Sequence, residues 1–217
     1  MQLAVMTARI ASGRAVAPRM IRGQGGRPLP DPEPPMLDVN GTHLRLVREG
    51  MWSVMNDRRG TARKSRIEAE GVEFAGKTGT SQVRRITAAE RAAGVFRNED
   101  LPWNRRDHAL FVGYAPYDAP RFAVSAVVEH GGGGSAVAAP IARDVIMRAL
   151  WGGEPPLSAY PPGAREEEME RRIRPPAPRP DDALPEAPST TGAAPEGGGP
   201  SSPSTGPADA PASGRRA

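Results

Sequence analysis

A seven-residue stretch, Gly76–Gln82 with the sequence GKTGTSQ, holds the residue types of this chain that are best suited to chemistry. It contains one of only two lysines in 217 residues, together with two threonines, a serine and two glycines. Two kinds of site place a lysine beside small hydroxyl and glycine residues. One is a phosphate-binding loop, whose backbone amides surround the phosphates. The other is the edge of a serine acyl-transfer site, where the lysine supplies a fixed positive charge.

The bare phosphate-loop pattern G-x-x-x-x-G-K-T is present from Gly71 to Thr78. Such a loop must connect a strand to a helix, because the helix N-terminus faces the phosphates. Here Val72 and Phe74 alternate as residues of a strand do, and the residues after Thr78 are poor helix formers. We therefore favour acyl-transfer chemistry for this stretch.

In an acyl-transfer site each residue type of the stretch has a physical role. The Lys77 ammonium supplies positive potential and a donor for a relay of hydroxyl groups, and the hydroxyls of Thr78 and Thr80 bind a substrate carboxylate. Gly79 lets a substrate backbone lie against the strand, and the amide that follows it completes an oxyanion hole. The alternative for Lys77 is a strand-edge lysine that opposes aggregation.

The hydrophobic pattern indicates which elements position this stretch. Apolar residues at helical spacing predict three helices. The first spans 1–10 and is ended by Gly13, and the second spans 42–57. The third follows a glycine run at 131–134 and extends to residue 150. We interpret that glycine run as a flexible turn. Apolar runs predict three strands, at 72–77, 109–115 and 122–129, the last two joined as a hairpin. The fold class is α/β (α+β): an antiparallel sheet flanked by helices, in which some elements of a complete domain are missing.

The last third of the chain differs in composition from the rest. Residues 152–217 hold 15 of the 25 prolines and no apolar run. Such a segment buries too little apolar area to offset the entropy of ordering it. We predict a folded domain portion at 1–151 and a disordered tail at 152–217, in which only 164–173 forms a short exposed helix.

Composition and charge exclude several classes of function. The formal net charge is +4, but no stripe of alternating aromatic and basic residues is present, so we predict no nucleic-acid partner. The chain has no cysteine, and its three histidines lack the spacing of metal ligands, so we predict no metal and no cofactor. We find no signal peptide and no apolar run of about 18 residues.

Five segments of the chain, in their order and spacing along the sequence, resemble the penicillin-binding protein 2 family, the class B D,D-transpeptidases of cell elongation. The resemblance covers residues 1–151 and is to the C-terminal part of the transpeptidase domain. It rests on five segments: MQLAVMTARIASG, EGMWSVMNDRRGTA, AGKTGTSQV, DHALFVGYAP and VVEHGGGGSAVAAP.

The resemblance implies a penicillin-binding transpeptidase (serine β-lactamase-like) fold and a serine acyltransferase that acts on peptidoglycan stem peptides ending in D-Ala-D-Ala and binds β-lactams. Lys77 would hold the hydroxyl relay in place, and the hydroxyls of Thr78 and Thr80 would bind the terminal carboxylate. The Thr80 amide would form half of the oxyanion hole. Ser81 and Gln82 would contact substrate. The family's partners are membrane proteins of the elongation complex, and its full-length members lie at the periplasmic face of the inner membrane.

The sequence departs from the family pattern in one important respect. No serine begins an S-x-x-K or an S-x-N motif, and Thr61-Ala62-Arg63-Lys64 is a loop rather than a substitute. We expect the nucleophile and the membrane anchor to precede this chain, the chain alone to be inactive, and an apolar face to be exposed where the missing elements pack. A non-catalytic remnant or a partner-binding half-domain is the alternative, and a serine β-lactamase or β-lactam sensor is a less favoured one.

Overall fold

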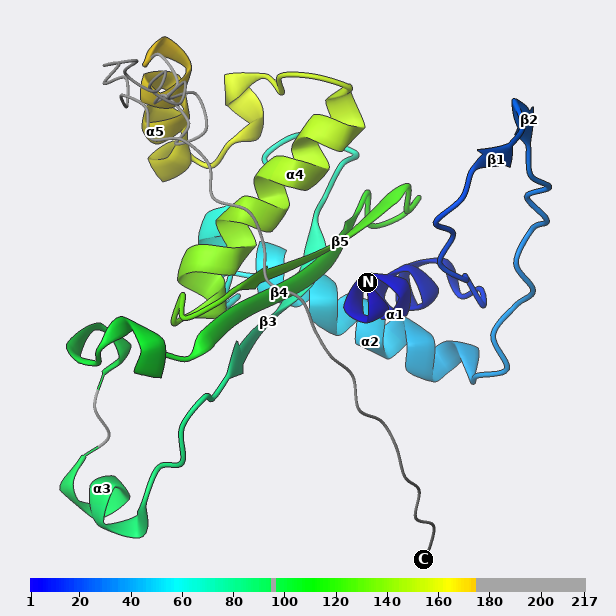
Figure 1. Ribbon diagram of the computed structural model, residues 1–217. Helices are drawn as coiled ribbons and strands as arrows, with labels where there is room; N and C mark the ends of the chain where they lie inside the picture. Colours follow the sequence, from blue (N-terminus) through cyan, green and yellow to red (C-terminus); the bar gives the residue numbers. More distant parts are fainter. Residues whose placement is uncertain (95–96, 175–217) are drawn as a thin grey trace, which may run out of the picture. The chain divides into compact units, whose positions relative to one another are not determined.

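A three-stranded antiparallel sheet lies at the centre of this computed structural model, which describes residues 1–94 and 97–174 (Figure 1). The strand order is β3-β4-β5, so β4 is central. The strands are β3 (Ala75–Ser81), β4 (His108–Ala115) and β5 (Phe122–Val128). The register places Leu110 opposite Gly79 on one side and opposite Val127 on the other. The predicted antiparallel sheet is confirmed, and the hairpin from β4 to β5 lies where the apolar runs predicted it.

The strand that carries the lysine is displaced from its predicted position. We expected it at 72–77, but β3 begins at Ala75 and runs to Ser81. The side chain of Phe74 is fully buried against Phe111, with ring centroids 5.5 Å apart, and Val72 lies in a turn. The apolar residues before β3 therefore fill the core, while the polar residues after them form the strand by pairing with β4.

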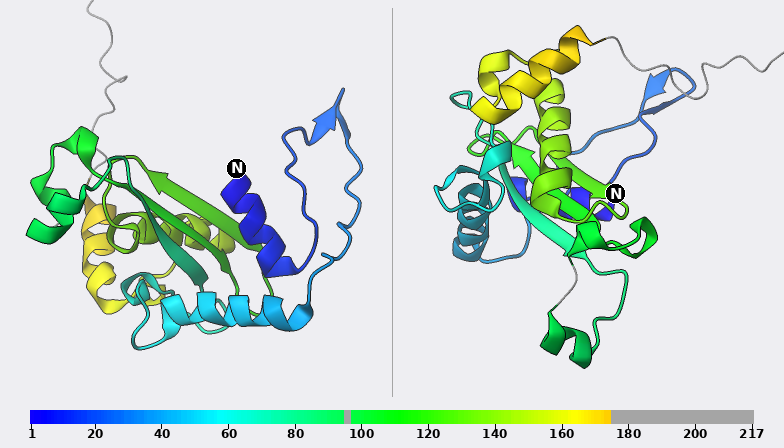
Figure 2. Two further views of the ribbon diagram at one scale, coloured as in Figure 1. Left: turned by 90° about the horizontal axis from the view of Figure 1, so that it is seen from below. Right: turned by 90° about the vertical axis from the view of Figure 1, so that its left-hand side faces the viewer.

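Helices cover both faces of the sheet (Figures 1 and 2). One face packs against α4 (Ala139–Trp151), which follows a turn of π-helix, η4 (Gly134–Ala138). The opposite face packs against α1 (Gln2–Ser12) and α2 (Gly41–Asn56).

Local signals explain where the first two helices begin and end. Gly13 ends α1 with a left-handed φ of 69°, which glycine adopts without strain. The Asn40 side chain caps α2 by accepting the Thr42 amide at 2.8 Å. The three predicted helices are thus present to within a few residues of their predicted ends.

Three connections between the main helices and strands contain short elements. Between α1 and α2 lies an exposed hairpin whose two strands, β1 (Gly23–Gln24) and β2 (Arg27–Pro28), are two residues long. A single turn of 3-10 helix, η1 (Arg63–Ser65), follows α2. Between β3 and β4 the described residues form three further turns: α3 (Ala88–Ala93), η2 (Asn98–Asp100) and η3 (Trp103–Arg105).

The chain continues as packed structure after Trp151, where we expected disorder. It forms a 3-10 turn, η5 (Leu157–Ala159), and a helix, α5 (Pro162–Ile173). Tyr160 is fully buried, with the Arg143 guanidinium 5.0 Å from its ring centre. A segment with few apolar residues is therefore held by one aromatic ring and by charged groups.

The predicted helix at 164–173 forms, but it is not simply exposed. Its Glu168 is only 3% exposed and accepts hydrogen bonds from Arg171 and, at 2.8 Å, from Arg172. Burial alone would raise the pKa of Glu168, but the hydrogen bonds from the two arginines outweigh it and lower that pKa below its usual value. Residues 175–217, the rest of the predicted tail, lie outside the described residues.

None of the helices in the described ranges is long and apolar enough to cross a membrane.

Candidate active-site strand

The strand β3 is an edge strand of the described sheet. Its one strand neighbour within residues 1–94 and 97–174 is β4. Exposure rises along it: Ala75 and Gly76 are buried, whereas Lys77, Thr80 and Ser81 are exposed. The predicted site residues Lys77 to Ser81 thus lie together on one accessible edge, and the exposed Gln82 follows directly.

Alternation along the strand divides these residues between two faces. Lys77 shares its face with Ala75, which packs against the α1 and α2 side, while Thr78 and Thr80 project from the α4 side. The Lys77 ammonium donates a hydrogen bond to the Thr78 carbonyl at 2.9 Å. The lysine therefore folds back onto its own strand, and its ammonium keeps two further N–H groups for other acceptors.

A close backbone contact fixes η4 against the middle of β3. A Cβ atom on Gly134 would lie 2.4 Å from the Gly79 carbonyl oxygen and 2.3 Å from that of Leu110, so only glycine fits there. At Gly133, by contrast, a Cβ atom would meet nothing within 4 Å. The glycine run at 131–134, which we interpreted as a flexible turn, therefore ends in a residue that is fixed by packing.

Two histidines and a tryptophan lie beside the end of β3, a grouping that the sequence did not predict. His108 pairs with Ser81 across the sheet, and its Nδ1 accepts the His130 amide at 2.9 Å. The His130 ring lies 4.7 Å from His108 and 4.5 Å from Trp103 between ring centroids. Pairing β4 with β5 is the signal that brings the two histidines together, because they stand at adjoining ends of these strands.

This cluster does not provide a metal site by itself. Among the described residues there is no group of three or more His, Cys, Asp or Glu side chains that could hold a metal ion. Trp103 is 63% exposed, so it does not anchor its loop as a buried residue.

An ion pair organises the chain that leaves β3. Arg84 donates two hydrogen bonds, of 2.6 and 2.7 Å, to the Glu90 carboxylate, and both side chains are largely buried. These hydrogen bonds raise the pKa of Arg84 above its usual value. The Thr87 hydroxyl caps α3 by accepting the Glu90 amide. The segment after Gln82 is thus held by charge and capping rather than by an apolar core.

The position of β3 removes the phosphate-loop alternative. Residues 76–81 pair with β4 along their length, so they do not form a loop that could surround a phosphate. The next helix, α3, begins only at Ala88. A phosphate loop requires a helix that starts directly after its Lys-Thr.

Comparison with known proteins places the chain in a family. The family described as penicillin binding protein transpeptidase domain matches residues 1–147. The Haemophilus influenzae peptidoglycan D,D-transpeptidase MrdA is 34% identical over 142 residues, which cover 63% of this chain and 21% of that protein. Escherichia coli K12 MrdA is 33% identical over 120 residues, which cover 55% of this chain and 18% of that protein. The chain thus spans about a fifth of the length of these relatives.

Two solved structures show the same fold. The crystal structure of Pseudomonas aeruginosa PBP2 in complex with WCK 5153 is 36% identical, with a TM-score of 0.51, over 69% of this chain and 29% of that one. The Helicobacter pylori PBP2 in its complex with MreC is 26% identical, with a TM-score of 0.50, over 68% of this chain and 24% of that one. The chain therefore belongs to the family of penicillin-binding protein transpeptidase domains, and it corresponds to the C-terminal part of that domain.

Proposed function

We propose that this chain is part of a peptidoglycan D,D-transpeptidase, in which β3 forms one edge of the active site. The observation that carries the proposal is the sequence Lys77-Thr78-Gly79-Thr80 on an accessible edge strand in a member of this family. The reaction is a serine acyl transfer. A serine attacks the carbonyl of the penultimate D-alanine, the terminal D-alanine leaves, and an amine of a neighbouring peptide takes the acyl group.

The edge strand suits an extended peptide substrate. A peptide can add to an uncovered strand edge through backbone hydrogen bonds, and Gly79 has no side chain to hold it away. The hydroxyls of Thr78 and Thr80 then hydrogen-bond the terminal carboxylate of the stem peptide or of a β-lactam. Ser81 and Gln82, both exposed at the end of the strand, extend the contact with substrate.

Lys77 and the amide of Thr80 act on the reacting groups. The Lys77 ammonium biases the site positively and donates to the hydroxyl relay that protonates the leaving group. The Thr80 amide stabilises the negative charge that develops on the carbonyl oxygen, an interaction that strengthens in the transition state.

The nucleophile must come from outside this sequence. Without an S-x-x-K or S-x-N motif the 217 residues cannot form the acyl-enzyme, so we propose that the chain alone is inactive. For the complete protein we propose a location at the periplasmic face of the inner membrane. Because the Helicobacter pylori relative forms a complex with MreC, we also propose partners among membrane proteins of the elongation complex.

The absence of both motifs favours a second candidate, a non-catalytic remnant or a half-domain that binds a partner. The coding sequence on the 5′ side of the Met1 codon distinguishes the two. An open frame that encodes S-x-x-K, S-x-N and an apolar anchor supports the transpeptidase. A stop codon or unrelated sequence would end the catalytic proposal for this chain.

A further inference from the structure

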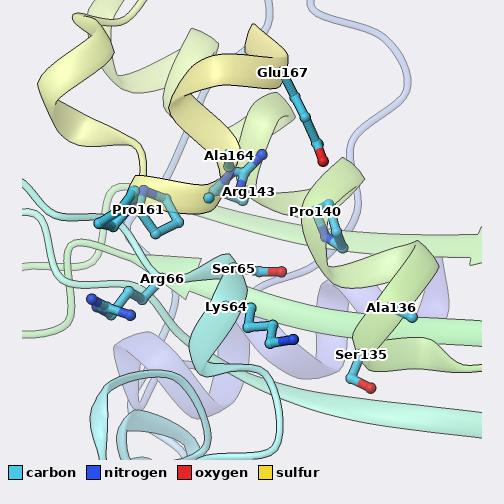
Figure 3. Close-up of a pocket in the computed structure, with 12 residues that line it drawn as sticks. Lys64, Ser65, Arg66, Ser135, Ala136, Pro140, Arg143, Pro161, Ala164 and Glu167 are labelled. Atoms are coloured by element: carbon cyan, nitrogen blue, oxygen red, sulfur yellow. The ribbon is translucent and has the colours of Figure 1, made fainter.

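We propose that a cavity between η1, the start of α4 and the start of α5 binds a phosphate group carried by a small molecule. The cavity has a volume of about 590 Å³, and none of its lining residues belongs to β3 (Figure 3). Its polar lining consists of Lys64, Ser65, Arg66, Ser135, Arg143 and Glu167. Proline and alanine side chains form the rest of the wall.

A hydroxyl that opens into the cavity has no partner in the described part of the chain. Ser65 is only 1% exposed, and its hydroxyl makes no hydrogen bond within the described parts of the chain. Because the Ser65 oxygen is accessible only through the cavity, its partner must be a water molecule or a ligand bound there. Figure 3 shows the Ser65 oxygen pointing into the space between η1 and the start of α4.

Lys64 supplies the cation next to this hydroxyl. Its ammonium has no ion pair or hydrogen bond to any described residue, and it points into the same space (Figure 3). Arg66 contributes less, because it is already paired with Glu68. The one carboxylate of the lining, Glu167, is exposed, so water screens its charge.

Arg143 adds a second, buried donor. It is 5% exposed, and its Nε and Nη2 atoms both lie 2.8 Å from an Asp144 carboxylate oxygen. Nη1 has no acceptor among the residues that the structure describes. Asp144 therefore fixes the guanidinium and leaves one nitrogen free to donate.

The start of α5 contributes a helix N-terminus, where backbone N–H groups and the helix dipole favour an anion. The first turn has no acidic residue and no capping side chain. The amides of Ala164 and Arg165 both donate to the Pro161 carbonyl, and Pro162 has no N–H, so the Gly163 amide has no partner in the described chain. The helix thus begins without a built-in anion.

The directions of these donors favour phosphate over carboxylate. The donors come from four elements: η1 with Lys64 and Ser65, η4 with Ser135, α4 with Arg143, and α5 with the Gly163 amide. A tetrahedral oxyanion presents oxygens in several directions and can accept from all four elements. A planar carboxylate presents two oxygens and suits a single fork of donors.

The two lysines of the chain make a direct test possible. The full chain is labelled with 13C at the lysine Cε, which gives two side-chain NMR signals that Lys64→Arg and Lys77→Arg variants assign. Sodium phosphate is titrated at pH 7, with sodium chloride holding the ionic strength constant. We expect the Lys64 signal to shift and saturate while the Lys77 signal stays in place.

Substitution of the buried hydroxyl sharpens this test. Ser65→Ala should weaken the phosphate affinity about tenfold, the usual loss for a hydrogen bond to a charged group. Ser53→Ala, a serine of α2 outside the cavity, is the matched control and should leave the affinity unchanged. Sodium acetate should bind at least about tenfold more weakly than phosphate.

Three outcomes would overturn the proposal: equal, unsaturated shifts of both lysine signals, an unchanged affinity in Ser65→Ala, or equal binding of acetate. If Ser65→Ala does not fold, the exposed Lys64 provides a second variant. Phosphate should raise the melting temperature of the parent chain relative to chloride at equal ionic strength, and Lys64→Ala should abolish that rise. An equal rise in Lys64→Ala would also refute the site.

Discussion

The buried apolar clusters on the two faces of the sheet differ in size. On the α4 side, Phe111 and Val124 pack with Ile146 and Met147 in the larger of the two buried clusters. On the α1 and α2 side, the buried cluster consists of Ala11, Met51, Ala75 and Tyr114. The same two helices expose Met6, Leu46 and Val47, which are 43%, 56% and 48% exposed.

This difference indicates that the described chain builds a full apolar core on the α4 side but only a small one on the α1 and α2 side. The outer side of α4 also exposes Ile141 and Val145, which are 45% and 54% exposed, so the size of the buried cluster, and not the exposed side chains, distinguishes the two faces. In the complete transpeptidase that we propose, we expect another part of the protein to cover the α1 and α2 side.

Truncation of a core side chain should have its largest effect on the α4 side. Phe111→Ala should lower the free energy of unfolding by about 3–5 kcal/mol, because it removes a fully buried ring and leaves a cavity. Met51→Ala, in the smaller cluster, should cost about 2 kcal/mol, the lower end of the range for such a change. Urea denaturation measures both, and an equal or larger loss in Met51→Ala would refute the comparison.

The packing of α5 should depend on one carboxylate. Glu168→Gln should lower the free energy of unfolding by about 2 kcal/mol, because it breaks the ion pairs with Arg171 and Arg172. Glu167→Gln, an exposed neighbour on the same helix, is the control and should change stability by no more than about 0.5 kcal/mol.

The same carboxylate should make stability depend on pH. Because folding lowers the pKa of Glu168, its contribution is present above the usual value of 4.5 and is lost as the pH falls through the folded-state pKa. The difference in stability between the parent chain and Glu168→Gln should therefore shrink below pH 4.5. A difference that stays constant between neutral and acidic pH would contradict the assigned ionisation.

The contact between η4 and β3 should tolerate no side chain. Gly134→Ala should destabilise the fold by about 1–3 kcal/mol, because its Cβ atom would clash with two carbonyl oxygens. Gly133→Ala should be nearly neutral, since it has open space and a φ of −89° that any residue adopts. Thermal melts of the two variants give the comparison, and equal melting temperatures would argue against the contact.

The uncovered side of α2 should accept a polar residue at little cost. Leu46→Ser should change the free energy of unfolding by no more than about 0.5 kcal/mol, because the side chain is already in solvent. The chain should also become more soluble. Static light scattering at increasing protein concentration measures this second effect, and unchanged association would count against an exposed contact surface.

Local patterns in the sequence predicted the elements that they control. Gly13 and Asn40 delimit helices through their own backbone and side-chain preferences, and dense apolar runs identified β4 and β5. The sequence did not predict where β3 begins, because its polar residues are held in the sheet by backbone pairing with β4. It also did not predict the packing of α5, since Tyr160 is buried against Arg143 and Arg172, which are distant from it in the sequence.

The candidate site was predictable in identity but not in arrangement. The motif from Lys77 to Thr80 named the residues, while their placement on an edge strand depends on which strands pair. The division of Lys77 from the two threonines and the contact of Gly134 are likewise consequences of tertiary packing. The cavity beside Ser65 joins three segments far apart in the chain, which no local pattern reveals.

The most direct test of the proposed active site is acylation by a fluorescent penicillin. The full chain replaces the matching 142-residue segment of Haemophilus influenzae MrdA, and thermal melting verifies that the chimera is folded. We predict that the chimera is labelled, that Lys77→Ala reduces the labelling rate about 100-fold or more, and that Arg58→Ala, an exposed cation after α2, leaves it unchanged. A folded chimera that is not labelled, or a Lys77→Ala chimera that is labelled as fast as its parent, would contradict the assignment of β3 to the active site.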